Sequence, residues 1–488
     1  MKKRIAHWTK GGALVAAILS GSVLSGCSDL LDVTLPSQLT DEVLDNPANA
    51  GILVNSFINA YETAWGNNEH YYAQGREAQG EIHTCGPCAP SFQGITSTSF
   101  TEMARAARFA RELYAKLDKE WTVQLVPQRA RYMALSSLYQ GAVLSWAGSS
   151  LCEYSPNGGK LQKADVTIDQ AVVMLNRALT EINAVGDFPV LNNIATSART
   201  MANGLLANTL YMKGDLAGAA AAAALVPNGF FAYVTRESGD RRNEYYTLGT
   251  NANLVDLYDP IDWWKSPIPN PATNQVWPAV LPFTGVTYLG ILPDGRAVND
   301  AGTAIRTQAG PPPYNNALGV TAGAVADTRV THKIVEVAAK GGVGAVSTRF
   351  TSEGDDIPIV DWRELLMIRA EAAGGQAAID FVNQLRTAAK LPLVTYANPA
   401  NTKEIRYMIM EEKRRSLYGE GRYYYTMLRN PDVNWFPRLQ GFSRGKARNL
   451  NGGVRYLMNA NEYTDNTNLT LADRGTGCRL EEKPWAPY

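Results

Sequence analysis

The sequence predicts a mainly α-helical protein in which helix pairs form a scaffold and a large irregular insert carries loops and short strands. Apolar residues recur at helical spacing through residues 37–226 and again through residues 359–430. Between them, residues 227–358 hold 12 of the 25 prolines and lack a sustained helical period. Residues 431–488 are again irregular.

The N-terminus has the features of a secretory signal peptide over residues 1–26. Basic residues lie among the first ten, and residues 11–23 are apolar and uncharged. This apolar run is far shorter than the roughly 20 residues that span a bilayer. Small residues precede Cys27 and resemble the lipobox of bacterial lipoproteins, which implies that Cys27 is acylated. The alternative is an ordinary signal followed by a chance cysteine. We expect residues 27–488 to form a single domain.

Four helices are predicted in the first part of the scaffold. The spacing favours helices over residues 41–61, 101–117 and 127–146, with residues 64–99 as a long loop. The fourth is expected to start at a capping box from Thr167 to Gln170 and to run to Val185.

Residues 197–226 predict a helical hairpin whose turn is Gly214–Asp215. Its small alanines allow two helices to approach closely. The segment resembles one tetratricopeptide unit, and such units stack on neighbouring helix pairs. A generic helical hairpin is the alternative.

Helices resume at Asp361. The pattern predicts one helix ending at Gly374–Gly375 and a return helix over residues 377–386. A second capping box, Asn401 with Glu404, precedes a helix over residues 405–417.

The charge balance argues against a nucleic-acid partner. Lys+Arg and Asp+Glu both number 46, so there is no basic excess to bind phosphate.

Four cysteines remain besides Cys27, and their even number in an exported chain predicts two disulfides. Three pairings are possible; we favour Cys85 with Cys88 and Cys152 with Cys478.

The spacing of Cys85 and Cys88 also matches the redox motif of thioredoxins. That motif follows a buried strand, whereas residues 80–84 are mostly polar, so a structural disulfide is preferred. A zinc site using His83 with these two cysteines would have His70 as its nearest further candidate and no clear fourth ligand. We predict no metal and no cofactor.

Two irregular segments combine aromatic rings with polar side chains, as carbohydrate sites do. A sugar ring has an apolar face that suits an aromatic ring and a polar rim that suits amides, carboxylates and guanidinium groups. The predicted ligand-binding residues of the first segment are Trp65, Asn67, Tyr71, Tyr72 and Arg76, accompanied by Asn68 and Glu77. Those of the second are Trp263, Trp264, Trp277 and Tyr288. We expect at least one ring from each segment to line a common groove.

The sequence contains none of the common catalytic motifs of hydrolases, zinc proteases or phosphate loops, so we expect a binding protein and not an enzyme. A glycosidase with two carboxylates is the enzymatic alternative, and Asp355–Asp356 is its most visible acidic pair. A tetratricopeptide-like scaffold that holds protein segments is the third possibility.

Two stretches near the C-terminus resemble the SusD/RagB family. They are residues 368–386, including Arg369-Ala370-Glu371-Ala372, and residues 411–421. Residues 28–33 after the lipobox are also similar to the start of mature chains of that family. Tyr423 and Thr426 depart from it, since they replace its usual arginine and aspartate. We expect Glu411, Arg414, Arg415 and Glu420 to form ion pairs that lock helices.

The resemblance implies a SusD-like helical scaffold and a nutrient-binding lipoprotein on the outer face of the outer membrane. Its implied partners are an oligosaccharide, or a peptide, and a TonB-dependent transporter barrel. The membrane would be reached through the lipid on Cys27.

Overall fold

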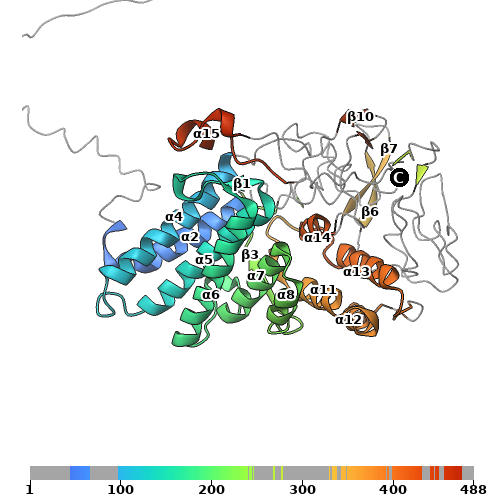
Figure 1. Cartoon of the computed structure of the whole chain (residues 1–488), viewed down its shortest axis with the longest axis horizontal. Coiled ribbons are helices and arrows are strands. Elements are labelled where there is room, and N and C mark those ends of the chain that lie inside the picture. Colours follow the sequence, from blue (N-terminus) through green and yellow to red (C-terminus); the bar gives the residue numbers. More distant parts are fainter. Residues whose placement is uncertain are drawn as a thin grey trace, which may run out of the picture. The chain divides into compact units, whose positions relative to one another are not determined.

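Helices dominate the computed structural model, as the periodicity predicts (Figure 1). The structure describes residues 44–65, 97–239, 241–243, 246, 268–269, 276–277, 329, 332–337, 342–347, 349–391, 393–394, 398–430, 440–443, 446–449 and 455–474. The chain divides into two units, residues 1–46 and residues 47–488. No helix within the described ranges is long and apolar enough to cross a membrane.

Each long helix packs on the next helix along the chain, so the helices form a continuous row (Figure 1). The described helices of the row that precede the insert are α2 (Ala50–Ala64), α4 (Ser97–Lys119), α5 (Arg129–Ser150), α6 (Ala164–Val185), α7 (Ala198–Lys213) and α8 (Leu216–Ala223). Those that follow it are α11 (Trp362–Ala373), α12 (Gly375–Ala388), α13 (Thr402–Ser416) and α14 (Tyr423–Arg429). Because α8 packs against α11, the row continues across the insert.

The predicted hairpin is present as α7 and α8. Ser197 caps α7 by accepting a hydrogen bond from the N–H of Thr200, and Asp215 caps α8 by accepting one from Gly218. Gly214 between them has a φ of 94°, which favours glycine. The turn Gly214–Asp215 is therefore confirmed.

The helix predicted over residues 41–61 is interrupted. Residues 41–43 lie outside the described residues and Leu44 is helical, but the chain leaves the helix at Asp45, and α2 begins at Ala50 after a short 3-10 turn, η1 (Pro47–Asn49). Pro47 disfavours helical backbone at the residue before it, which explains the break. The predicted start of α6 is wrong. Thr167 was expected to cap α6, but it lies inside that helix and donates to the carbonyl of Lys163. The sequence motif is present, but the helix begins one turn earlier.

A pair of strands brings the two ends of the insert together. β3 (Phe231–Val234) pairs antiparallel with β8 (Ile357–Asp361), with Phe231 opposite Asp361. Two short hairpins lie between them: β4 (Ile268–Pro269) with β5 (Val276–Trp277), and β6 (His332–Val337) with β7 (Gly342–Ser347). Short strands within residues 227–358 agree with the predicted insert.

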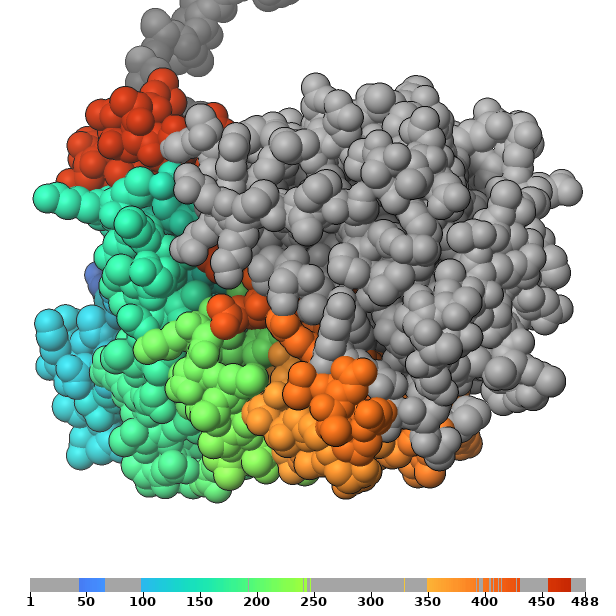
Figure 2. All heavy atoms as spheres, turned by 45° about the vertical axis from the view of Figure 1, so that its right-hand side comes forward, coloured from blue at the N-terminus to red at the C-terminus, as the bar shows by residue number. Residues whose placement is uncertain are grey.

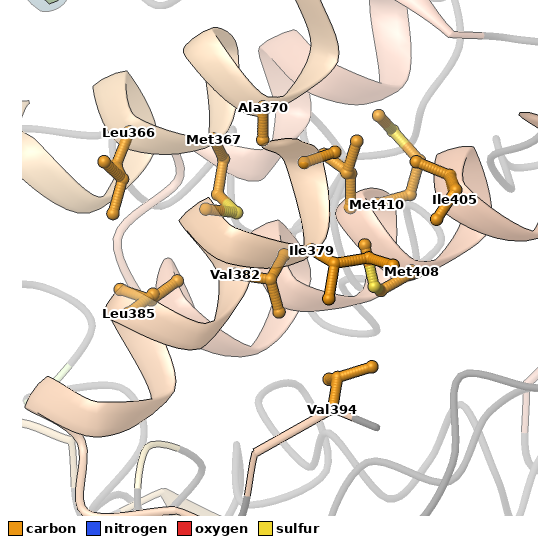
Figure 3. Packing of buried hydrophobic residues seen from close by; sticks show 12 residues of the cluster. Leu366, Met367, Ala370, Ile379, Val382, Leu385, Val394, Ile405, Met408 and Met410 are labelled. Atoms are coloured by element: carbon orange, nitrogen blue, oxygen red, sulfur yellow. The ribbon is translucent and has the colours of Figure 1, made fainter. Parts of the chain in front are cut away.

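The helices after the insert share an apolar core (Figure 3). Its side chains come from α11, α12 and α13 and include Met367, Val382 and Met408, all fully buried. Val394, from the segment between α12 and α13, covers one side of this cluster. The core fixes these three helices relative to one another.

The C-terminal region is mostly irregular, as expected. It contains β9 (Gln440–Ser443), β10 (Lys446–Asn449), α15 (Glu462–Asp465) and the 3-10 turn η7 (Leu471–Asp473). A bridge between Leu151 and Tyr456 joins it to the end of α5. Shorter elements complete the fold: β1 (Glu153–Tyr154) paired with β2 (Gln162–Lys163), and the turns η4 (Pro156–Gly158) and η5 (Leu191–Asn193).

Candidate functional site

Most of the predicted ligand-binding residues lie outside the described residues. Those outside are Asn67, Tyr71, Tyr72, Arg76, Trp263, Trp264 and Tyr288. Trp277 belongs to β5, opposite Ile268 of β4, and its side chain is not among those described. Trp65 directly follows α2 and is 3% exposed, with its ring centroid 6.4 Å from that of Tyr61. Trp65 therefore packs in the core, and we leave it out of the binding surface proposed below.

A small interior cavity of about 30 Å³ adjoins Trp65. Its walls combine aromatic rings with the buried ion pair of Glu364 and Arg422, whose Oε2 and Nη2 atoms are 2.8 Å apart. The side-chain amide of Asn208 also borders it and makes no hydrogen bond within the described protein. This volume suits one or two water molecules and is too small for a sugar ring.

The end of α2 is tied to the start of the insert. Glu62, which is 1% exposed, accepts hydrogen bonds from the N–H of Thr235 at 2.8 Å and from its hydroxyl at 2.6 Å. Arg241 forms an ion pair with the same carboxylate at 3.0 Å. The guanidinium of Arg236 donates to the backbone carbonyl of Glu62 at 2.8 Å. The end of α2 therefore lies beside Thr235, Arg236 and Arg241, near the start of the insert.

A larger surface pocket of about 460 Å³ lies between the α7–α8 turn, the α11–α12 junction and helices α13 and α14. Figure 2 shows the green atoms of the α7–α8 region meeting the orange atoms of α11–α13 at the surface. The volume falls in the range of small-molecule sites.

A chain of hydrogen bonds forms the base of this pocket. Lys413 donates to Glu371, and the hydroxyl of Tyr211 donates to the same carboxylate at 3.0 Å. Asn430 donates to the Tyr211 oxygen at 2.8 Å, and its own side-chain oxygen accepts from Arg406 at 2.9 Å. Burial and the adjacent Glu371 raise the pKa of Tyr211 well above its usual value, so Tyr211 remains a hydrogen-bond donor.

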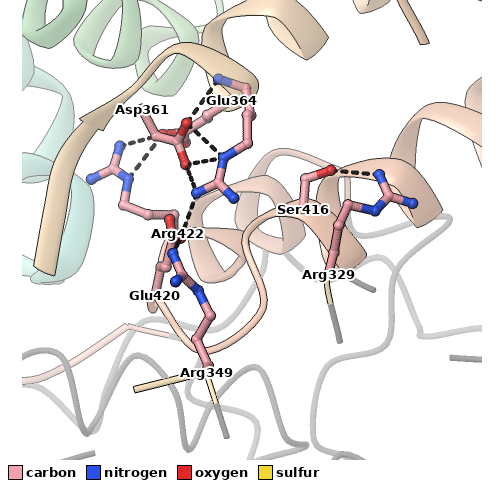
Figure 4. A network of polar contacts seen from close by, with 8 residues as sticks. Arg329, Arg349, Asp361, Glu364, Ser416, Glu420 and Arg422 are labelled. Carbon is pink, nitrogen blue, oxygen red and sulfur yellow. Dashed lines mark hydrogen bonds and ion pairs between the residues drawn. The ribbon is translucent and has the colours of Figure 1, made fainter. Parts of the chain in front are cut away.

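A network of buried ion pairs joins the insert to the helices (Figure 4). Glu420, after α13, pairs with Arg349 from the end of the insert and with Arg363 in α11. Asp361 caps α11 through the N–H of Arg363 and pairs with the same guanidinium. The ion pairing expected for Glu420 is therefore present.

A second buried carboxylate joins the same regions. Glu412 in α13 pairs with Arg329 of the insert and with Arg386 of α12, at 2.9 Å for Arg386. Arg329 also donates to the hydroxyl of Ser416 at 2.8 Å (Figure 4). These carboxylates are fully buried and occupied by guanidinium groups, so they serve to hold the fold and not to contact a ligand.

Cys152 is disulfide-bonded. Cys27, Cys85, Cys88 and Cys478 lie outside the described residues, so the pairing stays a prediction. Within the described ranges, acidic, histidine and cysteine side chains form no group suited to a metal ion.

Sequence reasoning missed the surface pocket because its side chains come from four separated parts of the chain. Tyr211, Glu371, Arg406 and Asn430 share no motif and meet only through the packing of α7, α11, α13 and α14. The resemblance of residues 368–372 to the SusD/RagB family drew attention to Glu371. It did not show which side chains contact that residue.

Comparison with known proteins supports the resemblance noted in the sequence. Residues 301–480 match the family model described as the SusD family. This part of the chain carries the sequence pattern of that family. No curated protein sequence matches the chain.

Solved SusD-like structures share the fold over nearly their full length. A SusD superfamily protein from Bacteroides fragilis NCTC 9343 has a TM-score of 0.54 at 11% identity, covering 86% of this chain and 98% of that chain. A SusD-like carbohydrate binding protein from Bacteroides vulgatus ATCC 8482 has a TM-score of 0.51 at 13% identity, with 87% and 97% covered. Surface glycan-binding protein A from Bacteroides uniformis also has 0.51, at 12% identity, with 87% and 98% covered.

Proposed function

We propose that this protein is a lipid-anchored, cell-surface member of the SusD/RagB family that binds oligosaccharides and delivers them to a TonB-dependent transporter in the outer membrane. The family match over residues 301–480 is the observation that carries the proposal. The names of two similar structures, a carbohydrate binding protein and a glycan-binding protein, support the ligand class. The signal peptide and lipobox support the anchoring and the location.

The binding surface is proposed to lie where residues 66–77 and the insert meet. Glu62 holds the start of the insert through Thr235 and Arg241, so the end of α2, which precedes residues 66–77 in the sequence, lies next to the start of the insert. Rings from Tyr71 and Tyr72 on one side and from Trp263, Trp264, Trp277 and Tyr288 on the other would then face one ligand. Such rings supply large contact areas to the apolar faces of sugars.

Binding without cleavage is favoured over hydrolysis. The acidic pair Asp355–Asp356 is occupied by the turn that contains it: Asp355 accepts hydrogen bonds from Thr351 and Ser352, and Asp356 accepts one from the N–H of Arg236 at 2.7 Å. Carboxylates engaged in this way are poor candidates for a glycosidase pair. Incubation with labelled oligosaccharides separates the two classes, since retention of intact ligand supports binding and shortened products support an enzyme.

A pull-down from solubilised outer membranes tests the delivery step. Co-purification of a large barrel protein supports transport. Recovery of soluble protein partners without a barrel would instead favour a tetratricopeptide-like interaction scaffold, in which the helix row would hold protein segments.

A further inference from the structure

We propose that the surface pocket between the α7–α8 turn, α11–α12, α13 and α14 binds a negatively charged sugar, namely a uronate unit of an acidic oligosaccharide. This inference rests on the proposed oligosaccharide-binding function, and it places a second ligand-binding position on the helices α7, α8 and α11–α14.

Charge is the first reason. The guanidinium groups of Arg406 and Arg429 both line the pocket. Arg429 is exposed and makes no ion pair with any residue that the structure describes. The third charged lining residue, Glu371, is already neutralised by Lys413, which is fully buried. The pocket therefore presents positive charge to a ligand, and guanidinium groups match carboxylates in geometry.

The pocket is also pre-organised. Arg406 is held by Asn430, which is 6% exposed, and Asn430 is in turn fixed by Tyr211. The guanidinium of Arg429 lies over Gly214, where an added Cβ would come within 2.9 Å of Nη2. A side chain at position 214 would therefore displace Arg429. Because Arg406 is held by Asn430, it loses little side-chain entropy when a ligand binds.

Size and polarity select a sugar over a simple anion. About 460 Å³ exceeds the need of an inorganic ion, and Leu216, Ile405 and Ile409 provide an apolar wall for the C–H face of a ring. Amino acids and peptide C-termini fit less well when they carry an ammonium group. The carboxylate that would receive it, Glu371, is occupied by Lys413 and Tyr211.

Calorimetric titration of the purified protein with oligogalacturonate and with its carboxyl-reduced counterpart tests this inference. We expect the acidic form to bind about tenfold more tightly, and Arg429→Gln to remove most of that advantage while leaving the affinity for the reduced form and the melting temperature unchanged. Arg108→Gln is the matched control, because Arg108 is an exposed arginine on α4 that lies outside the pocket lining. It should leave both affinities unchanged.

Three outcomes would overturn the inference. They are equal affinity for the acidic and reduced forms, an Arg429→Gln variant that behaves like Arg108→Gln, and binding of inorganic sulfate as tight as that of oligogalacturonate. If neutral oligosaccharides still bind in these cases, the proposed function survives and this inference alone fails. If none of a broad panel of acidic and neutral oligosaccharides binds, both fail.

Discussion

Nη2 of Arg363, in the first turn of α11, lies 2.5 Å from Oε1 of Glu420, in the loop after α13. Arg349, at the end of the insert, contacts the same carboxylate (Figure 4). One buried acid therefore joins three segments that are distant in the sequence. The stability of the region around the insert depends on it.

Replacement of Glu420 by alanine should strongly destabilise the fold. It would leave two guanidinium groups without their shared buried acid, and removal of one partner from a buried pair costs about 3–5 kcal/mol. Urea unfolding followed by circular dichroism measures the loss. Glu112→Ala is the control, because Glu112 forms an exposed pair with Arg108 and should contribute less than about 1 kcal/mol. Equal effects of the two changes would contradict a structural role for Glu420.

The raised pKa of Asp361 predicts that the stability of the protein depends on pH. Burial, with a further contribution from the nearby Glu420, raises the pKa of Asp361 to about 7 although Arg363 acts to lower it. Its ordinary value is 3.8, so the folded state binds more protons between these values. The contribution of Asp361 to stability is therefore present at low pH and is lost as the pH rises through about 7.

The free energy of unfolding should accordingly fall between about pH 4 and pH 7. In Asp361→Asn, which cannot titrate, the fall should be smaller by more than about 1 kcal/mol, since each unit of pKa shift corresponds to about 1.4 kcal/mol. Denaturant unfolding at several pH values measures both proteins. The same fall in wild type and variant would show that Asp361 is ionised throughout this range.

The contact between α5 and α6 is close enough to require glycine at position 148. A Cβ there would lie 2.6 Å from a side-chain carbon of Ile168 and 2.9 Å from its backbone nitrogen. Gly148→Ala should lower the free energy of unfolding by about 1–3 kcal/mol through overpacking. At Gly354 the nearest atom is 3.8 Å away, so Gly354→Ala is the control and should have little effect. An unchanged stability of Gly148→Ala would mean that the two helices can separate without cost.

Much of the scaffold could be predicted because helical spacing and local caps are properties of short segments. Ser197 marks the start of α7, and Gly214 and Asp215 define the α7–α8 turn by themselves. The strand pair β3–β8 could not be predicted in the same way, because Phe231 and Asp361 meet only once the insert is closed. For the same reason the sequence could not show that Trp65 is buried, since its burial comes from Tyr61 and from packing beyond its own segment.

Cys27→Ala tests the lipid anchor. Because acylation requires the thiol of Cys27, the variant should be released from membranes or remain unprocessed. Fractionation of cells, followed by mass measurement of the mature N-terminus, distinguishes these states. A variant that still sediments with membranes as mature protein would exclude Cys27 as the anchor.

The proposal that both aromatic segments bind an oligosaccharide is best tested by measuring the affinity of the purified protein for oligosaccharides. The measurement is made on wild type and on single alanine replacements of Tyr71, Tyr72, Trp263 and Trp264. We predict that wild type binds an oligosaccharide and that at least one replacement in each segment weakens binding more than about tenfold, with a nearly unchanged melting temperature. Phe109→Ala on α4 is the aromatic control and should leave the affinity unchanged. If every replacement in the two segments lowers the melting temperature and spares the affinity, these rings belong to the core and the account of the binding surface is wrong.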